Sequence, residues 1–192
     1  MPGKRAPVDQ RRDEILDAAF RVAAQKGLEK LTVREVATEA GLSNGLVFFH
    51  FETKEALLLA MLDGLTAWML GGHDEDPSQP TQFVDQIRND SNFGGQERQF
   101  LELFIEFLVI GARHPVMRKR LREALKQYRQ VFHSPAKNLI QSHEQSLPNT
   151  TPESLSALAA SLVIGNAVQA LLDPKWMGAE KPLSAIEDIW EG

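Results

Sequence analysis

Cysteine is absent from the 192-residue chain, which excludes disulfides, Cys-ligated zinc and thiol catalysis. Long hydrophobic runs are absent as well. The two richest, LFIEFLVIGA and LAASLVIGNA, carry Glu106 and Asn166 and are shorter than a membrane span. No basic segment followed by an apolar one opens the chain, so we expect no signal peptide. These absences predict a cytoplasmic protein that does not enter a membrane.

Basic residues are fewer than acidic ones, and the net charge is −5. A strong electrostatic footprint for nucleic acid would be more basic than this. The acidic excess lies after residue 55, however, whereas Lys4, Arg5, Arg11 and Arg12 lie in or beside an N-terminal arm. Charge therefore neither requires nor excludes DNA as a partner.

Strand-like alternation is missing too, and apolar residues recur at helical spacing along the chain, so we expect an all-α fold. Helices are predicted over residues 11–26 and 81–90, over a segment ending near Arg113, and from Glu153 to Leu172. Apolar residues from Met117 to Leu139 keep helical period through Pro135, which predicts one long helix kinked at that proline. Leu183, Ile186 and Trp190 indicate a short last helix.

The stretch from Thr32 to Lys54, TVREVATEAGLSNGLVFFHFETK, is the most informative part of the sequence. Thr32 and Glu35 have the spacing of a capping box, and the apolar residues at 33, 36, 37 and 40 share one helix face. Gly41 suits the left-handed end of that helix, and Ser43 can cap the next one. Helix, glycine-containing turn and short helix form a helix-turn-helix, whose second helix reads the DNA major groove.

Residues 11–58 resemble the DNA-binding region of the tetracycline-repressor (TetR) family of bacterial regulators. The matching residues are ILDAAF at 15–20, Gly27, TVREVATEAGLS at 32–43, Gly45, His50-Phe51 and TKEALL at 53–58. The resemblance implies a three-helix DNA-binding head, residues 1–52, and a larger helical domain, residues 53–192, that binds a small molecule and dimerises. It further implies a ligand-responsive repressor that binds a pseudo-palindromic operator as a homodimer and is released by a small, partly apolar effector.

The recognition helix departs from the family pattern. The family commonly has a basic residue where this chain has Asn44, and a tyrosine where it has Phe48. Asn44 can pair with adenine in the major groove, or it can serve as a second capping group. Val47 and Phe51 are expected in the core, so apolar side chains at 46, 48 and 49 must partly face outward, where they can contact thymine methyls. The alternative for Phe48 is packing under the neighbouring helices.

Phosphate anchoring would fall to Thr32, Ser43, His50 and Lys54, with Arg34 on the exposed side of the second helix. Arg34 and Lys54 can equally be solvated surface residues. The predicted DNA-binding residues are Thr32, Arg34, Ser43, Asn44, Gly45, Leu46, Phe48, Phe49, His50 and Lys54.

Aromatic residues supply material for an effector pocket in the larger domain, although at helical spacing such residues are more often core. Asn166 and Gln169 stand on otherwise apolar faces, where they can orient a ligand or satisfy each other at an interface. The predicted effector residues are Trp68, Phe100, Phe104, Phe107, Tyr128, Phe132, Asn166 and Gln169.

The predicted helix from Glu153 to Leu172 is apolar nearly all round, and such a helix needs burial on two sides. Ala157, Ser161 and Gly165 form a stripe of small residues that lets another helix approach closely. We therefore expect a homodimer through about this helix and the C-terminal helix. The alternative is a central core helix within one monomer.

The two alternative classes of function are an enzyme and a helical binding module that does not recognise DNA. The five histidines form no HExxH motif or catalytic triad, His73 lies in an acidic loop, and no glycine-rich phosphate loop occurs. We therefore expect no enzyme activity, no cofactor and no metal site. The acidic balance and the uncharged start of the recognition helix keep open a helical effector- or protein-binding module on the same fold that has lost sequence-specific DNA binding.

Overall fold

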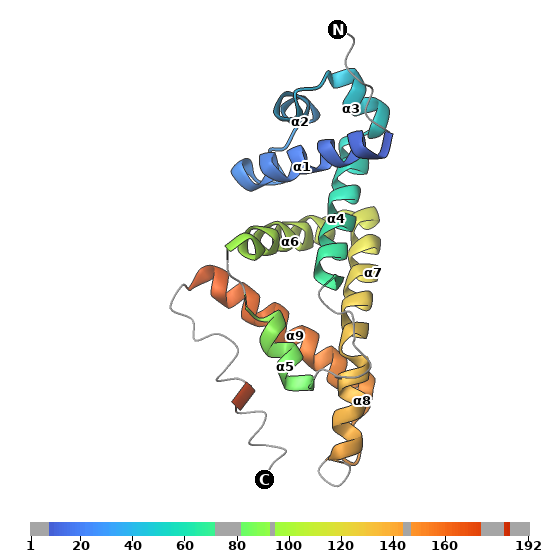
Figure 1. The fold of residues 1–192 in the computed structure, drawn as a ribbon, viewed down its shortest axis with the longest axis vertical. Coiled ribbons are helices and arrows are strands. Elements are labelled where there is room, and N and C mark those ends of the chain that lie inside the picture. Colours follow the sequence, from blue (N-terminus) through green and yellow to red (C-terminus); the bar gives the residue numbers. More distant parts are fainter. Residues whose placement is uncertain (1–7, 72–81, 93–94, 144–146, 174–182, 185–192) are drawn as a thin grey trace. The chain divides into compact units, whose positions relative to one another are not determined.

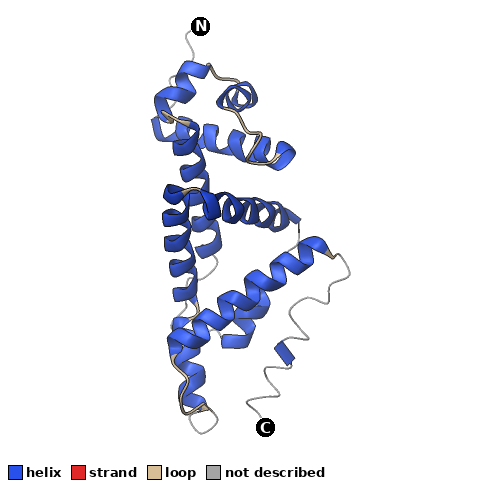
Figure 2. Cartoon of the chain, turned by 180° about the vertical axis from the view of Figure 1, so that it is seen from behind, coloured by secondary structure: helices blue, strands red, loops and turns tan. Residues whose placement is uncertain are grey.

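The computed structural model describes residues 8–71, 82–92, 95–143, 147–173 and 183–184. Over these ranges the regular elements are helices, without a strand (Figure 2). In chain order they are α1 (Val8–Lys26), α2 (Val33–Ala40), α3 (Asn44–His50), α4 (Lys54–Leu70), α5 (Phe83–Asp90), α6 (Gly95–Arg113), α7 (Pro115–Val131), α8 (His133–Ser142) and α9 (Pro152–Leu172) (Figure 1).

The chain divides into two compact units. The N-terminal unit comprises Met1–Leu65 and Leu103–Leu121, and the C-terminal unit comprises Thr66–Glu102 and Arg122–Gly192. The first part of α4 and the latter part of α6 therefore belong to the same unit as α1, α2 and α3.

Local capping interactions set the ends of the short N-terminal helices. At the start of α2 the Thr32 hydroxyl accepts a hydrogen bond from the Glu35 N–H, and the Glu35 carboxylate accepts one from the Thr32 N–H, which confirms the predicted capping box. Gly41 ends α2 with φ 66°, a left-handed conformation that glycine adopts without a Cβ clash. Ser43 caps α3, and its hydroxyl accepts a hydrogen bond from the Leu46 N–H at 3.2 Å.

The core of the N-terminal unit takes residues from all of its helices. Ile15 and Leu57 are fully buried on α1 and α4. Val47 and Phe51, at 0% and 2% exposure, anchor the short α3, as the sequence predicts. Ion pairs from Arg21 to Glu39 and from Lys26 to Glu35 join α1 to α2 on the surface.

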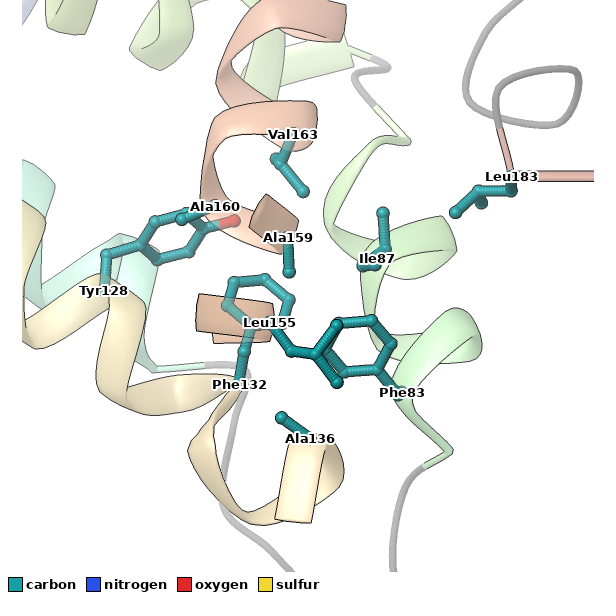
Figure 3. Close-up of a cluster of buried hydrophobic side chains, with 10 residues drawn as sticks. All are labelled: Phe83, Ile87, Tyr128, Phe132, Ala136, Leu155, Ala159, Ala160, Val163 and Leu183. Atoms are coloured by element: carbon teal, nitrogen blue, oxygen red, sulfur yellow. The ribbon is translucent and has the colours of Figure 1, made fainter. Parts of the chain in front are cut away.

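The C-terminal unit has a core cluster drawn from helices that are distant in sequence (Figure 3). It joins α5, α7, α8 and α9, and also takes in Leu183. Its members are Phe83, Ile87, Tyr128, Phe132, Ala136, Leu155, Ala159, Ala160, Val163 and Leu183. Full burial of a large apolar side chain in such a cluster stabilises the fold by about 1.5–3 kcal/mol.

The predicted single helix through Pro135 is wrong. α7 ends at Val131, α8 begins at His133, and the break falls at the fully buried Phe132. Pro135 lies in the first turn of α8, where its missing N–H removes no intrahelical hydrogen bond. Of the predicted last helix only residues 183–184 are described, as helical. Ile186 and Trp190 lie outside the described residues.

Helix α9 is the one described helix that by length and composition would qualify as a membrane span. Four of its residues, Leu155, Ala159, Ala160 and Val163, belong to the buried core cluster, and the polar Asn166 is buried as well. These are the features of a core helix in a helical domain.

Candidate DNA-binding interface

The turn between α2 and α3 has the geometry of a helix-turn-helix. The Gly41 and Leu42 N–H groups return to the Thr38 and Ala37 carbonyls at 3.1 and 2.8 Å, which closes the end of α2. Ser43 then starts α3, so Ser43, and not Asn44, is the N-cap residue. Since Val47 is the buried residue of α3, the other sides of this short helix are open to a partner.

The open face of α3 is unusually aromatic. Phe49 is 73% exposed and Phe48 is 49% exposed, so neither lies under the neighbouring helices as a core residue would. Asn44 and Gly45 are exposed beside them, and Leu46 and His50 are half-buried. The Phe49 and His50 rings meet edge to face with centroids 5.3 Å apart, which limits the freedom of both side chains.

Three of the predicted phosphate-anchoring residues, Thr32, Ser43 and Lys54, already have hydrogen-bond partners within the N-terminal unit. The hydroxyls of Thr32 and Ser43 serve as helix caps. The Lys54 ammonium donates to the Glu29 carbonyl at 2.9 Å, while the Arg34 side chain lies on the exposed side of α2. The hydrogen bond from Lys26, and the Thr32 bonds after it, lower the pKa of Glu35, so α2 keeps a carboxylate in its first turn.

The predicted effector residues fall in both units. In the C-terminal unit Trp68 is 39% exposed and its ring lies against that of Phe100, with centroids 5.1 Å apart. Tyr128 and Phe132 are members of the buried core cluster, with their rings edge to face at 5.4 Å. On α9, Asn166 is buried, whereas Gln169 is exposed and donates to the Gly165 carbonyl.

The remaining two aromatic residues, Phe104 and Phe107, lie on the part of α6 that belongs to the N-terminal unit, and both are buried. The structure thus brings Trp68 and Phe100 together and does not gather all the predicted aromatics in one cluster.

Two polar residues, Asp90 and Glu106, make long-range contacts that the sequence did not predict. The Tyr128 hydroxyl donates to the Asp90 carboxylate at 2.6 Å, and burial, reinforced by the Asp90 charge, raises the pKa of Tyr128. The Glu106 carboxylate accepts from the Leu28 N–H at 2.6 Å. The available signal for Glu106 was a lone carboxylate inside an apolar run. In the part of the chain that the structure describes, no three His, Asp or Glu side chains come together as a metal site.

The family model for bacterial regulatory proteins of the tetR family matches residues 15–61, which include the helix-turn-helix. This segment of the chain is therefore similar to the DNA-binding region of the TetR family. Similarity of fold extends beyond the matched segment. The multidrug-binding protein EbrR, in a structure with ethidium, is 25% identical, has a TM-score of 0.69 and aligns with 94% of this chain and 98% of its own.

Two curated regulators show how similarity is distributed along the chain. The transcriptional repressor KstR2 of Mycolicibacterium smegmatis is 35% identical over 77 residues, or 40% of this chain and 38% of its own. The transcriptional regulator BetI of Brucella anthropi is 26% identical over 185 residues, or 93% of this chain and 90% of its own. The stronger similarity thus spans less than two thirds of KstR2 and the weaker one nearly all of BetI.

Proposed function

We propose that this chain is a TetR-family, ligand-responsive, DNA-binding transcriptional regulator located in the cytoplasm. It acts as a repressor that binds a pseudo-palindromic operator as a homodimer and is released by a small, partly apolar effector. We assign DNA binding to residues 1–52 and effector binding and dimerisation to residues 53–192.

One observation carries this proposal: α3 is fixed by a cap and a buried residue, yet exposes Asn44, Phe48 and Phe49. A helix of seven residues has little intrinsic stability, so its fixed position comes from packing of the N-terminal unit. Exposed aromatics on so short a helix suit a partner surface. In this proposal Asn44 pairs with adenine, while Phe48 and Phe49 contact thymine methyls.

The phosphate contacts in this proposal come from Thr32, Ser43, His50 and Lys54. Arg34 reaches the same DNA backbone from the exposed side of α2. Such contacts position the protein without selecting a sequence. The weakly basic head therefore favours recognition through base contacts in the groove, supported by a second head on the other half-site.

We assign dimerisation to α9 and the C-terminal helix. The residues of α9 opposite its buried side include Ser161 and Gly165, and a Cβ added at Gly165 would meet no atom within 4 Å. Leu158 and Leu172, at 48% and 81% exposure, lie on the same helix. A partner helix that covers this face would remove two large apolar side chains from water.

We assign effector binding to the C-terminal unit, near Trp68 and Phe100. Their contacting rings are partly open, and aromatic faces bind apolar or cationic ligands. EbrR, which has this fold, binds the aromatic cation ethidium. Asn166 and Gln169 are proposed to orient the ligand.

Selection of DNA from a random pool by the purified full chain, followed by a salt titration, tests the proposal. We expect one enriched sequence with two inverted half-sites, and binding that weakens linearly with the logarithm of salt concentration. A chain that enriches no sequence would be the helical module without sequence-specific DNA binding.

A further inference from the structure

The C-terminal ends of α1 and α2 have similar backbone geometry, but at the end of α1 one backbone N–H group is bound by another helix and not by α1 itself. Both helices end at a glycine with positive φ, 82° at Gly27 and 66° at Gly41, and a leucine follows each glycine. At the end of α2 the Leu42 N–H returns to the Ala37 carbonyl at 2.8 Å, so the helix satisfies its own backbone.

At the end of α1 the corresponding N–H has a partner from α6. The Gly27 N–H returns to the Ala23 carbonyl at 2.7 Å, which is the simpler left-handed cap. The next N–H, that of Leu28, donates to the Glu106 carboxylate at 2.6 Å across 78 residues of sequence. A carboxylate acceptor makes this a charge-assisted hydrogen bond, roughly twice as strong as a neutral one.

The space around Gly27 fits the same contact. A Cβ at this position would meet Glu106 Oε2 at 3.2 Å, so the carboxylate sits directly against the left-handed residue. The connecting loop is also held from α4, where Lys54 donates to the Glu29 carbonyl at 2.9 Å. Leu28 and Leu31, both fully buried, anchor the loop between α1 and α2 in the core.

Helix α6 carries a second long-range contact of the same kind. Eight residues before Glu106, the Arg98 guanidinium donates to the Ala170 and Leu171 carbonyls at 3.3 and 3.2 Å, at the C-terminal end of α9. One helix thus completes the C-terminal end of α9 with a cation and that of α1 with an anion.

We propose that Glu106 is the positioning residue that holds the DNA-binding head in its operator-binding geometry, by completing the end of α1 from α6. The inference rests on the proposed function, because it assigns the regulation of that same head. A displacement of α6 either carries the end of α1 with it or breaks the Leu28 hydrogen bond. Both outcomes change the placement of α2 and α3, which follow this loop.

Three variants distinguish the positioning role of Glu106 from a general effect of its negative charge on DNA binding. Glu106→Ala removes the acceptor and one negative charge, Glu106→Gln keeps an acceptor oxygen without the charge, and Glu97→Ala removes an exposed charge from the same helix. Loss of a negative charge alone would strengthen binding to DNA slightly in all three. We expect instead that only Glu106→Ala loses affinity for the pool-selected operator, by about tenfold, with an unchanged salt slope.

The Leu28 amide gives a readout that needs no DNA. In the wild-type chain its hydrogen exchange should be as slow as that of Leu42, and Glu106→Ala should accelerate exchange at Leu28 by about tenfold while leaving Leu42 unchanged. Circular dichroism confirms that each variant is folded. If Glu106→Ala does not fold, the exchange rate of the Leu28 amide in the wild-type chain still decides the matter, because slow exchange supports the proposed role and rapid exchange overturns it.

The outcomes are distinguishable. Equal operator affinity, within twofold, of Glu106→Ala and Glu106→Gln overturns the role of Glu106 but leaves the proposed function standing. Rapid exchange of the wild-type Leu28 amide overturns it as well. If the wild-type chain enriches no DNA sequence, the proposed function fails, and the positioning role fails with it.

Discussion

Two pairs of phenylalanines, one pair in each unit, have opposite surroundings. In the C-terminal unit Phe83 and Phe132 are 3% and 0% exposed, within a cluster drawn from four helices. In the N-terminal unit Phe48 and Phe49 are 49% and 73% exposed, on a helix of seven residues. The first pair contributes to stability by removal from water. The second pair keeps much of its surface in water and so contributes less to stability, and a role in binding accounts better for its exposure.

The largest effect is expected from truncation of a buried ring. Phe132→Ala should lower the free energy of unfolding by about 3–5 kcal/mol, because the surrounding helices cannot fully close the cavity. Phe49→Ala, the matched exposed variant, should change it by no more than about 0.5 kcal/mol. Urea denaturation of both variants measures the difference, and a similar loss in both would erase the contrast between the units.

The next effect concerns base readout. Asn44→Ala should weaken operator binding by about 1–3 kcal/mol, at one base position, if the amide pairs bidentately with adenine. Competition with operators changed one base pair at a time measures this loss. Unchanged sequence preference in the variant would contradict the role of Asn44 and would leave specificity to the aromatic residues.

Contact with a thymine methyl group should contribute less binding free energy than the Asn44 hydrogen bonds. Replacement of a contacted thymine by deoxyuridine removes one methyl group and should weaken wild-type binding by about 0.8 kcal/mol, or about fourfold. The same replacement should have no effect on Phe49→Ala if that ring makes the contact, and Phe48→Ala provides the matched comparison. Equal binding of both operators by the wild-type chain would show that α3 does not read methyl groups.

The Lys54 prediction concerns salt dependence. Lys54→Ala should weaken binding to all sequences alike and lower the salt slope by about one. Its existing hydrogen bond to Glu29 competes with this role. A titration that gives the wild-type slope would assign Lys54 to the loop alone.

The smallest effect is the pH dependence of the α2 capping box. Hydrogen bonds from Lys26 and Thr32 lower the pKa of Glu35 below its ordinary value of 4.5 in the folded state. The stability contribution is therefore present above pH 4.5 and is lost as the pH falls through the lowered pKa. Melting temperatures of wild type and Glu35→Gln should differ at neutral pH and converge in acid. A constant difference would rule out the ionised carboxylate as the cause.

Local interactions explain why the helix-turn-helix was predictable. Thr32, Glu35, Gly41 and Ser43 act within a few residues of sequence, and the structure confirms the capping box and both caps. The burial of Val47 and Phe51 followed from helical period, which also left the neighbouring aromatics outside.

Long-range packing explains what the sequence did not reveal. The break between α7 and α8 falls at Phe132, whose ring lies in the core cluster, whereas Pro135 lies in the first turn of α8, where a proline is tolerated. The contacts of Asp90 with Tyr128 and of Glu106 with Leu28 join residues 38 and 78 positions apart. No local pattern specifies such pairs.

The specificity ratio of the wild-type chain tests sequence recognition by α3 most directly. It compares the affinity for the selected operator with that for a scrambled duplex of the same composition, at one physiological salt concentration. A regulator that reads bases through α3 should bind the operator at least about 10³-fold more tightly. Affinities within tenfold of each other would mean that only the phosphate backbone is bound, and would contradict sequence recognition by this helix.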